Sequence, residues 1–280
     1  MNFETAIHKA SVELKKNDIK SHLLDSEILM SKAINKDREF VILNLDRDLR
    51  KNNYLYFKKL VDQRSKGKPI AYLIGKKSFW KYEFDINENV LIPRPDTELI
   101  IENILKIYKN KKTIKFLDIG VGSGCILLSI LKEKNNFLGT GIDLSKECIK
   151  LSKINAKKLG IKNRIKFIKT DVDNFSLGKY DLIISNPPYI KKLDLKSLDK
   201  DVINFEPKLA LDGGLAGISE IRKVINKSSE LIKKNGRLVL EIAFKQKYEV
   251  KKLLQDKGFY INTIVKDLAK KDRCIISTKI

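Results

Sequence analysis

The sequence of 280 residues has few of the side chains that form covalent or metal-based sites. Its cysteines, Cys125, Cys148 and Cys274, are odd in number, widely separated and without a C-x-x-C pair, and its only histidines are His8 and His22. This scarcity argues against a disulfide framework and against a metal site. A cysteine nucleophile would need an N-terminal histidine to reach the C-terminal half, so we expect the cysteines to be small buried hydrophobic residues.

Long apolar runs are also missing. No stretch approaches the roughly 18 apolar residues that span a bilayer, and Met1 to Lys15 is too polar for a secretory signal. We therefore expect a soluble, cytoplasmic monomer with no membrane partner. With 42% apolar residues, a chain of this length forms one large core or two smaller ones, and two domains are the better prediction.

Acidic side chains are in deficit. The 57 lysine and arginine residues against 35 aspartate and glutamate residues give a net charge of +22 and a pI near 9.7, which ordinarily indicates nucleic-acid binding. Only nine of the 57 are arginine, however, and lysine, asparagine and isoleucine recur along the whole length. A background preference for lysine explains much of the charge, so we predict no specific nucleic-acid partner, while association with ribosomes stays open.

Residues 1–80 are predicted to form a helical bundle. Apolar positions recur at helical spacing at Phe3, Ile7, Ala10 and Leu14, at Leu24 and Ile28, and at Tyr54, Phe57, Val61 and Arg64. Gly67 and Pro69 end the last of these helices. Because the segment has no cluster of catalytic side chains, we interpret it as a substrate-docking module. The alternative, a domain needed only for stability, stays open.

Residues 81–95 are predicted to form a β-hairpin linker. Tyr82, Phe84 and Ile86 alternate with polar residues, a turn follows at Asn87–Asn89, and Val90–Ile92 resume the apolar side. This pattern indicates two short strands and a hinge between domains.

The segment Pro93 to Glu98, which begins within the linker, fixes the chain and supplies an N-cap for the next helix. Arg94, Thr97 and Glu98 are concentrated just before the C-terminal half. We therefore expect them to make a contact across its site.

Residues 96–280 alternate strands and helices, which predicts an α/β fold with a doubly wound sheet. The expected strands are 114–119, 137–142, 165–168, 182–185, 237–242, 260–265 and 273–278. The expected helices lie near 124–134, 145–159, 217–234 and 246–257.

A short apolar run ends in an unusual loop. Leu182–Ile184 are followed closely by Asn186, Pro187, Pro188 and Tyr189, and prolines cannot continue a sheet ladder. The loop should be stiff and should display the Asn186 side-chain carbonyl and the Pro187 backbone carbonyl beside the ring of Tyr189. Two acceptors and a flat surface suit a planar NH2 group, although a proline-stiffened turn around a core tyrosine is the structural alternative.

A glycine turn predicts a ligand at another strand end. Gly120-Val121-Gly122-Ser123-Gly124 follows a strand and opens a helix, and such glycines let the backbone approach a ligand closely. The pattern is G-x-G-x-G, whereas dinucleotide folds use G-x-G-x-x-G. A nicotinamide oxidoreductase is therefore disfavoured, because the turn is not built to hold a pyrophosphate.

Acidic residues complete the predicted cofactor site. Asp143, nineteen residues after Gly124, ends the next strand and can accept both hydroxyls of a ribose. Asp171 ends the third strand and can accept from an adenine amino group while Val172 packs on the base. Asp118 precedes the glycine turn and suits an ammonium group. These features fit a cationic nucleoside without phosphate, and S-adenosylmethionine matches that description.

Taken together, these residues make the sequence resemble the class I methyltransferases, and specifically the peptide chain release factor glutamine N5-methyltransferases of the HemK/PrmC family. The resemblance covers nearly the whole chain. Its motifs are Tyr72-Leu73-Ile74-Gly75, Pro93 to Glu98, the glycine turn, Asn186 to Ile190, and Phe205-Glu206-Pro207-Lys208-Leu209-Ala210-Leu211 with Gly213, Gly214 and Gly217.

The resemblance implies a Rossmann-like sheet, mostly parallel with an antiparallel last strand, beside the helical bundle and the hairpin. It implies that Gly120–Gly124, Asp143 and Asn186 bind S-adenosylmethionine, with the position of Val172 alongside the adenine. It also implies that Asn186–Tyr189 hold a glutamine in the Gly-Gly-Gln loop of a release factor. Relatives carry a bulkier aromatic residue at position 172, so this sequence departs from the pattern there.

No Cys, His or Ser base stands in the Asn-Pro-Pro-Tyr motif, so we expect catalysis by placement and polarisation of the amide by Asn186, Pro187 and the ring of Tyr189. Two other functions stay open. Enzymes that methylate the exocyclic amine of adenine or cytosine need the same acceptors for a flipped base. A non-catalytic ribosome-associated protein would use the charge alone.

Overall fold

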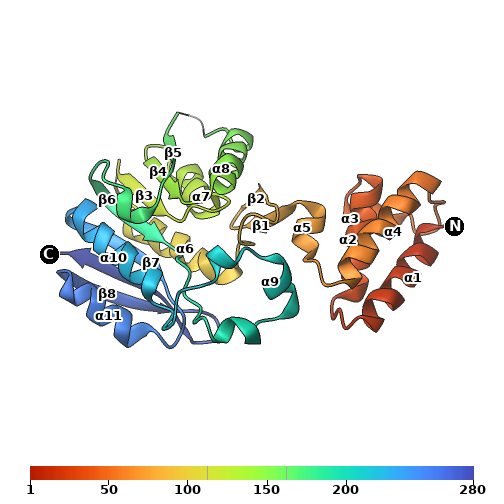
Figure 1. Ribbon diagram of the computed structural model, residues 1–280. Coiled ribbons are helices and arrows are strands. Elements are labelled where there is room, and N and C mark those ends of the chain that lie inside the picture. The colour runs from red at the N-terminus through yellow and green to blue at the C-terminus, as the bar shows by residue number, and fades with distance from the viewer. Residues whose placement is uncertain (112, 162) are drawn as a thin grey trace. The chain divides into compact units, whose positions relative to one another are not determined.

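The computed structural model describes residues 1–111, 113–161 and 163–280. It divides into two compact units, one formed by Met1–Lys76 with Asp199–Phe205 and the other by Lys77–Leu198 with Glu206–Ile280 (Figure 1). Within the described residues, no helix combines the length and the apolar character that crossing a membrane requires.

The N-terminal unit is a helical bundle. Its helices are α1 (Phe3–Lys16), α2 (His22–Ile34), α3 (Arg38–Leu43), α4 (Lys51–Ser65), α5 (Ile70–Ile74) and α9 (Lys200–Phe205). The Asn2 side chain caps α1 by accepting from the Thr5 amide at 3.0 Å. All four residues of the predicted α1 stripe are buried in the bundle core, so that prediction is confirmed.

The predicted apolar stripe of α2 is wrong. Leu24 is 45% exposed, and the helix instead buries Leu29 and Met30 beside two polar residues, Asp25 and Ser26. Both polar residues are hydrogen-bonded: the Ser26 hydroxyl donates to the His22 carbonyl, and Asp25 accepts from an arginine of α4. Because its buried face contains satisfied polar groups, the helix shows no clear apolar period.

A buried ion pair holds α2 to α4. The Arg64 Nε donates to the Asp25 carboxylate at 2.7 Å, and its Nη1 donates to the Lys68 carbonyl at 3.1 Å, just beyond the end of α4. The two side chains are only 10% and 3% exposed. The pair therefore balances a buried charge and also joins α4 to the chain that follows it.

The second unit contains a seven-stranded sheet of order β5-β4-β3-β6-β7-β9-β8 (Figure 1). Its strands are β3 (Lys115–Ile119), β4 (Leu138–Asp143), β5 (Ile165–Lys169), β6 (Tyr180–Ser185), β7 (Ile232–Glu241), β8 (Phe259–Lys266) and β9 (Asp272–Lys279). β9 runs antiparallel to both of its neighbours, and the other pairs are parallel. The predicted fold class is confirmed.

Helices cover both faces of this sheet. The helices of this unit are η1 (Pro95–Thr97), α6 (Glu98–Ile107), α7 (Cys125–Glu133), α8 (Lys146–Lys158), η2 (Val172–Asn174), η3 (Asp194–Ser197), η4 (Lys208–Ala210), α10 (Ser219–Leu231) and α11 (Lys247–Asp256), and the two layers are formed by α6, α7 and α8 and by α10 and α11. Phe116 of β3 belongs to the core with α6, α7 and α8, and the next residue, Leu117, belongs to the core with α10 and α11. Successive strand residues thus serve opposite layers.

Strand order reverses between β3 and β6. From β3 the chain proceeds outward to β4 and β5, then returns to pair β6 with the other side of β3. In open α/β sheets, ligands bind beyond the carboxyl ends of the strands at such a reversal. The glycine turn follows β3 and the Asn-Pro-Pro-Tyr loop follows β6, so both predicted halves of the site start at this point.

The predicted hairpin has the wrong partner strand: the strand at Tyr82 pairs with the segment before it and not with the segment after it. The small sheet pairs β1 (Lys76–Phe79) with β2 (Tyr82–Asp85), and Val90–Ile92 form no strand. The turn between β1 and β2 places Trp80 at φ +57°, where its amide donates to Glu98 and its indole donates to Glu133. A tryptophan rarely occupies this conformation, so no turn-forming residue marks this position in the sequence.

We expect Asp25→Ala to lower the free energy of unfolding of the N-terminal unit by about 3–5 kcal/mol, because Arg64 would keep a buried, unpaired charge. Hydrogen exchange of peptides from residues 1–76 of the full chain measures this change. Arg38→Ala is the matched control, since it opens the Arg38–Glu27 pair, whose arginine is 44% exposed, and should cost less than about 1 kcal/mol. Equal losses in the two variants would contradict the prediction.

Candidate active site

The glycine turn after β3 has the backbone conformation that its sequence requires. Gly120, Gly122 and Gly124 have φ values of +79°, +54° and +83°. A side chain at Gly124 would also place its Cβ 2.9 Å from Leu128 of α7. The turn therefore depends on glycine at all three positions, through φ at each and through helix packing at the third.

The turn is fastened to β4 and α8. The Gly122 amide donates to one oxygen of Asp143 at 2.9 Å, and the Ser145 amide donates to the other at 2.9 Å. From α8, the Ser152 hydroxyl donates to the Gly122 carbonyl and the Asn155 amide donates to the Ser123 carbonyl. Each Asp143 oxygen accepts one hydrogen bond and keeps capacity for another, as a ribose contact would need.

Asp118 is a buried carboxylate without a hydrogen-bond partner. It is 1% exposed, and neither carboxylate oxygen has a partner in the part of the chain that the structure describes. Burial, with a smaller contribution from the charge of Asp143, raises the pKa of Asp118 to about 8. An orphaned acid of this kind fits a cationic ligand group, which would supply the missing donor and the missing charge.

The predicted adenine contacts lie beside Asp143. The Thr170 amide donates to the Asp143 carbonyl at 2.9 Å, which joins the ends of β4 and β5. The Asp171 carboxylate caps η2 by accepting from the Asp173 amide at 2.9 Å. Val172 is partly buried against the sheet core. The structure thus places these two residues at the expected strand end, with Asp171 already engaged in a turn.

Asn186 begins the loop after β6 and is held from outside the loop. Its side-chain Nδ2 donates to the Thr97 hydroxyl at 3.2 Å. Among the described residues, no hydrogen bond reaches the Asn186 Oδ1 or the Pro187 carbonyl. The two predicted acceptors are therefore unengaged, and the Asn186 Oδ1 is the end of the side-chain amide that does not contact Thr97.

Tyr189 is anchored at both ends. Its hydroxyl donates to the Glu241 carboxylate at 3.1 Å, and its backbone carbonyl accepts from the Gln246 side chain at 2.9 Å. Its ring packs partly against the sheet core. Burial and the nearby Glu241 raise the pKa of the Tyr189 hydroxyl, so it stays protonated and donates. The role predicted for Tyr189 from the sequence was that of the ring alone, and the hydroxyl bond to Glu241 was not predicted.

A second segment forms a wall behind the loop. Ile190 forms a parallel bridge with Asp212, and a Cβ at Gly213 would lie 2.8 Å from the Tyr189 Cα. Gly217 has φ +76°, and a Cβ there would lie 2.6 Å from the Tyr189 carbonyl oxygen. Backbone approaches backbone so closely that only glycine fits, which explains the glycines in this motif.

The predicted contact across the site comes from Thr97 alone. Arg94 instead donates at 2.6 Å to the buried carboxylate of Glu206, which also accepts from the Ile92 amide. Glu98 accepts from the Trp80 amide. Arg94 therefore joins its segment to the Phe205–Leu211 motif, and Glu98 closes the small hairpin.

Glu241, Gln246 and Asn155 were not identified from the sequence. All three are buried polar residues whose partners lie far along the chain, and glutamate, glutamine and asparagine ordinarily face solvent. Glu241 gave the clearest available signal, because it ends an apolar strand at the same sheet edge as the other site residues.

The cysteines are poor nucleophiles here. Cys148 and Cys274 are buried and Cys125 is partly exposed. Burial raises the pKa of Cys125 and of Cys148 to about 12 and raises that of Cys274 as well. Among residues 1–111, 113–161 and 163–280, no group of His, Cys, Asp or Glu side chains is arranged to hold a metal ion.

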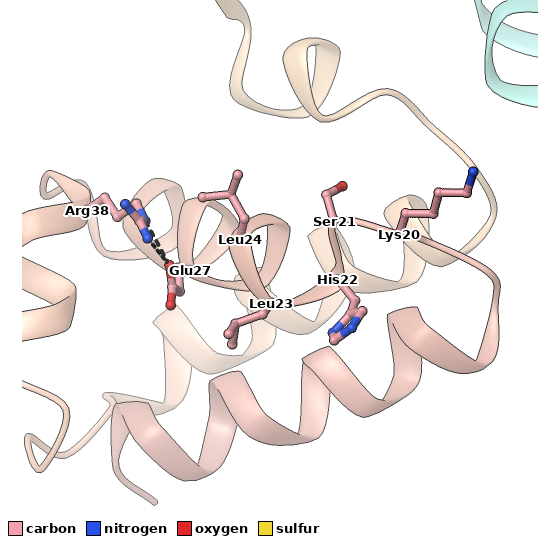
Figure 2. Close-up of a pocket in the computed structure, with 7 residues that line it drawn as sticks. All are labelled: Lys20, Ser21, His22, Leu23, Leu24, Glu27 and Arg38. Atoms are coloured by element: carbon pink, nitrogen blue, oxygen red, sulfur yellow. Dashed lines mark hydrogen bonds and ion pairs between the residues drawn. The ribbon is translucent and has the colours of Figure 1, made fainter.

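A surface pocket lies in the N-terminal unit and contains none of the predicted site residues. Figure 2 shows it, with the Glu27–Arg38 ion pair at one side. Its volume is about 290 Å³, and it is lined by Lys20, Ser21, His22, Leu23, Leu24, Glu27 and Arg38. Its lining offers no strand-end acids or glycine turn, so the candidate active site remains the edge of the sheet at β3 and β6.

Comparison with known proteins assigns both parts of the chain. Residues 5–75 match the PrmC N-terminal domain and residues 110–275 match a methyltransferase domain. The chain is 33% identical over 282 residues to the release factor glutamine methyltransferase of Clostridium acetobutylicum, covering 100% of this chain and 99% of that protein. It is 33% identical over its full length to the bifunctional methyltransferase of Rickettsia felis, of which it spans 58%.

Among solved structures, a methyltransferase from Pyrococcus furiosus superposes with a TM-score of 0.53 at 16% identity, covering 72% of this chain and 91% of that one. At this identity the likeness concerns the fold alone. It agrees with the sheet topology described above.

We expect Asp118→Asn to stabilise the ligand-free protein in a pH-dependent way. The folded-state pKa of about 8 lies above the ordinary aspartate value near 4, so the stability that Asp118 contributes falls as pH rises between these values. The variant should gain most over the wild type above pH 8 and least near pH 4. Urea unfolding at several pH values measures the gain.

The matched control is Asp173→Asn, which removes the same charge from an exposed position. Because this carboxylate stays in water when the chain folds, its removal should change the free energy of unfolding far less than Asp118→Asn does. A pH-independent effect of Asp118→Asn would contradict the burial of an unpaired charge.

Proposed function

The chain belongs to the release factor glutamine methyltransferase family, and from this membership we propose that it methylates the N5 amide nitrogen of the glutamine in the Gly-Gly-Gln motif of a peptide chain release factor. The methyl donor in this proposal is S-adenosylmethionine. The supporting observation is the pair of unengaged acceptors, the Asn186 Oδ1 and the Pro187 carbonyl, at the point where strand order reverses.

The two acceptors fit the two hydrogens of a primary amide. The Asn186 Nδ2 already donates to Thr97, so its Oδ1 remains for an incoming N–H, and the Pro187 carbonyl is available for the second. The neighbouring prolines restrict the backbone, so little conformational freedom is lost when the amide binds. The loop would thereby hold the amide nitrogen in one orientation.

The residues for the cofactor also fit. When bound, S-adenosylmethionine supplies a methyl group on a cationic sulfonium. Asp118 would take its ammonium group, and Asp143 would accept from its ribose hydroxyls. Asp171 and Val172 would contact the adenine, and the open turn Gly120–Gly124 would let the backbone approach the ligand.

The chain has to make an amide nitrogen reactive without a base. The lone pair of an amide is delocalised, and the loop contains no Cys, His or Ser. Asn186 and Pro187 would polarise the N–H bonds and favour the positive charge that develops on nitrogen, and the proton would leave afterwards to solvent. Binding geometry and electrostatics would supply the rate enhancement.

The helical bundle would serve as the docking module for the release factor. Leu23 and Leu24 beside the pocket of Figure 2 are 53% and 45% exposed, and Leu43 of α3 is 82% exposed. Exposed leucines in a unit without catalytic residues suit a protein-binding surface. The division of the chain would then separate substrate docking from chemistry.

The test of this function is mass spectrometry of an unmethylated release factor after incubation with the protein and S-adenosylmethionine. One added methyl on the Gly-Gly-Gln glutamine is the expected result. A nucleic-acid control should remain unlabelled. Labelling of adenine or cytosine instead, with no methyl on the glutamine, would favour a nucleic-acid amine methyltransferase and overturn the proposal.

In the same assay, we expect Asn186→Ala to lower the rate of methyl transfer by about 100-fold or more, because one of the two amide acceptors is lost. Binding of S-adenosylmethionine, measured by calorimetry, should weaken only modestly. Tyr189→Phe should cost less, about tenfold, because it removes one hydrogen bond to Glu241 and keeps the ring.

The matched control is Asn110→Ala, which makes the same substitution at an exposed position and should transfer methyl groups at the wild-type rate. Retention of activity in Asn186→Ala would remove the assigned role from this residue.

A further inference from the structure

Glu241 is a buried acid that the chemistry above does not use. It is the last residue of β7, next to the end of β6, and it is 1% exposed. Its Oε1 accepts from the Tyr189 hydroxyl at 3.1 Å. Its Oε2 is buried and has no partner of ordinary hydrogen-bond geometry within the described residues. A buried carboxylate oxygen left open in this way calls for a donor.

The neighbouring donor is the Thr97 hydroxyl. Thr97 is 3% exposed, and its oxygen already accepts from the Asn186 Nδ2 at 3.2 Å. Its single proton must therefore point elsewhere. The Thr97 hydroxyl lowers the pKa of the Glu241 carboxyl, and the buried Oε2 of that carboxyl is an acceptor left open.

Two observed hydrogen bonds, from Asn186 to Thr97 and from Tyr189 to Glu241, would become one directed series if the Thr97 hydroxyl donated to the open Glu241 Oε2. We propose that Glu241 is a positioning residue: by accepting the Thr97 proton, it forces Thr97 to accept from Asn186 and keeps the Asn186 Oδ1 turned toward the substrate amide. This inference rests on the proposed function, because the amide that meets Oδ1 belongs to the substrate. It adds Glu241 and Thr97 to the residues that determine turnover.

The direction of this series can reverse. If position 241 carries a donor toward Thr97, as a neutral acid or an amide can, the Thr97 oxygen accepts from it and its proton turns to Asn186. The Asn186 amide then gains by rotating its oxygen toward Thr97, and its NH2 group faces the site. Two NH2 groups would meet, and the substrate would lose an acceptor.

The surroundings place this reversal near neutral pH. Burial raises the pKa of Glu241 to about 7, while the hydroxyls of Thr97 and Tyr189 and the charge of Arg273 oppose the rise. The charge of Asp96 raises the pKa of Glu241, and the charge of Glu241 in turn raises the pKa of the Cys125 and Cys274 thiols. The carboxylate form, which holds Asn186 correctly, predominates above pH 7 and is lost below it.

The first measurement needs no substrate. The side-chain NH2 signals of Asn186, assigned by their loss in Asn186→Ala, are followed by ¹H–¹⁵N NMR of the full chain between pH 5.5 and 8.5. In the wild type they should shift with a midpoint near 7. In Glu241→Gln and in Thr97→Val, they should lose this transition. An unchanged transition in both variants would overturn the inference.

The second measurement is the rate of methyl transfer. Glu241→Gln should lower kcat about tenfold at pH 8 and abolish the fall in rate below pH 7, with little change in S-adenosylmethionine binding. Thr97→Ser keeps the hydroxyl and should retain wild-type behaviour. The double variant Glu241→Gln, Thr97→Val should transfer methyl groups only slightly more slowly than Thr97→Val alone, because both substitutions break the same series of hydrogen bonds.

Multiplicative losses in the double variant, or a wild-type pH profile in Glu241→Gln, would reduce Glu241 to a structural role. The two measurements also separate this inference from the proposed function. A normal Asn186 transition without methyl transfer to glutamine by the wild type would leave the series of hydrogen bonds intact and overturn the reaction. Methyl transfer to glutamine without the Asn186 transition would support the reaction and overturn the inference about Glu241.

Discussion

The parallel pairing of β3 with β6 is the constraint on which the site depends. It places Ile119 opposite Ser185, and the Ser185 hydroxyl strengthens the pairing by donating to the Ile119 carbonyl at 2.7 Å. The glycine turn and the Asn-Pro-Pro-Tyr loop leave these two strands at the same edge. More than sixty residues of chain separate them, yet the register of one strand pair sets their spacing. A slip in that register would move both halves of the site relative to each other.

Buried polar side chains then fix each loop around this edge. Asn155 holds the glycine turn, Gln246 holds the carbonyl of Tyr189, and Glu206 holds the segment before η1 through Arg94. Each group satisfies backbone or charged atoms that would otherwise be unpaired in the interior. The loops are thus positioned by hydrogen bonds to the scaffold, while the apolar layers position the scaffold itself.

The sequence predicted the sheet well, because most strands contain a short group of apolar residues, as in Leu182–Ile184, and turn-forming residues separate them from the helices. It failed where conformation depends on distant partners. Trp80 adopts a positive φ that Glu98 and Glu133 support, and α2 buries Asp25 against Arg64. Thr97 was expected to reach the site, but its bond to Asn186 and the role of Glu241 required the tertiary arrangement. Residue type and spacing show which groups are present, and only packing shows which of them meet.

The orphaned carboxylate of Asp118 has a consequence for product release under the proposed function. The spent cofactor keeps its ammonium group after the methyl has left, so Asp118 would hold substrate and product alike. Such uniform binding raises occupancy without lowering the chemical barrier. Only the positive charge lost at sulfur would then distinguish the spent cofactor from the methyl donor. The spent cofactor would therefore bind well and inhibit the enzyme.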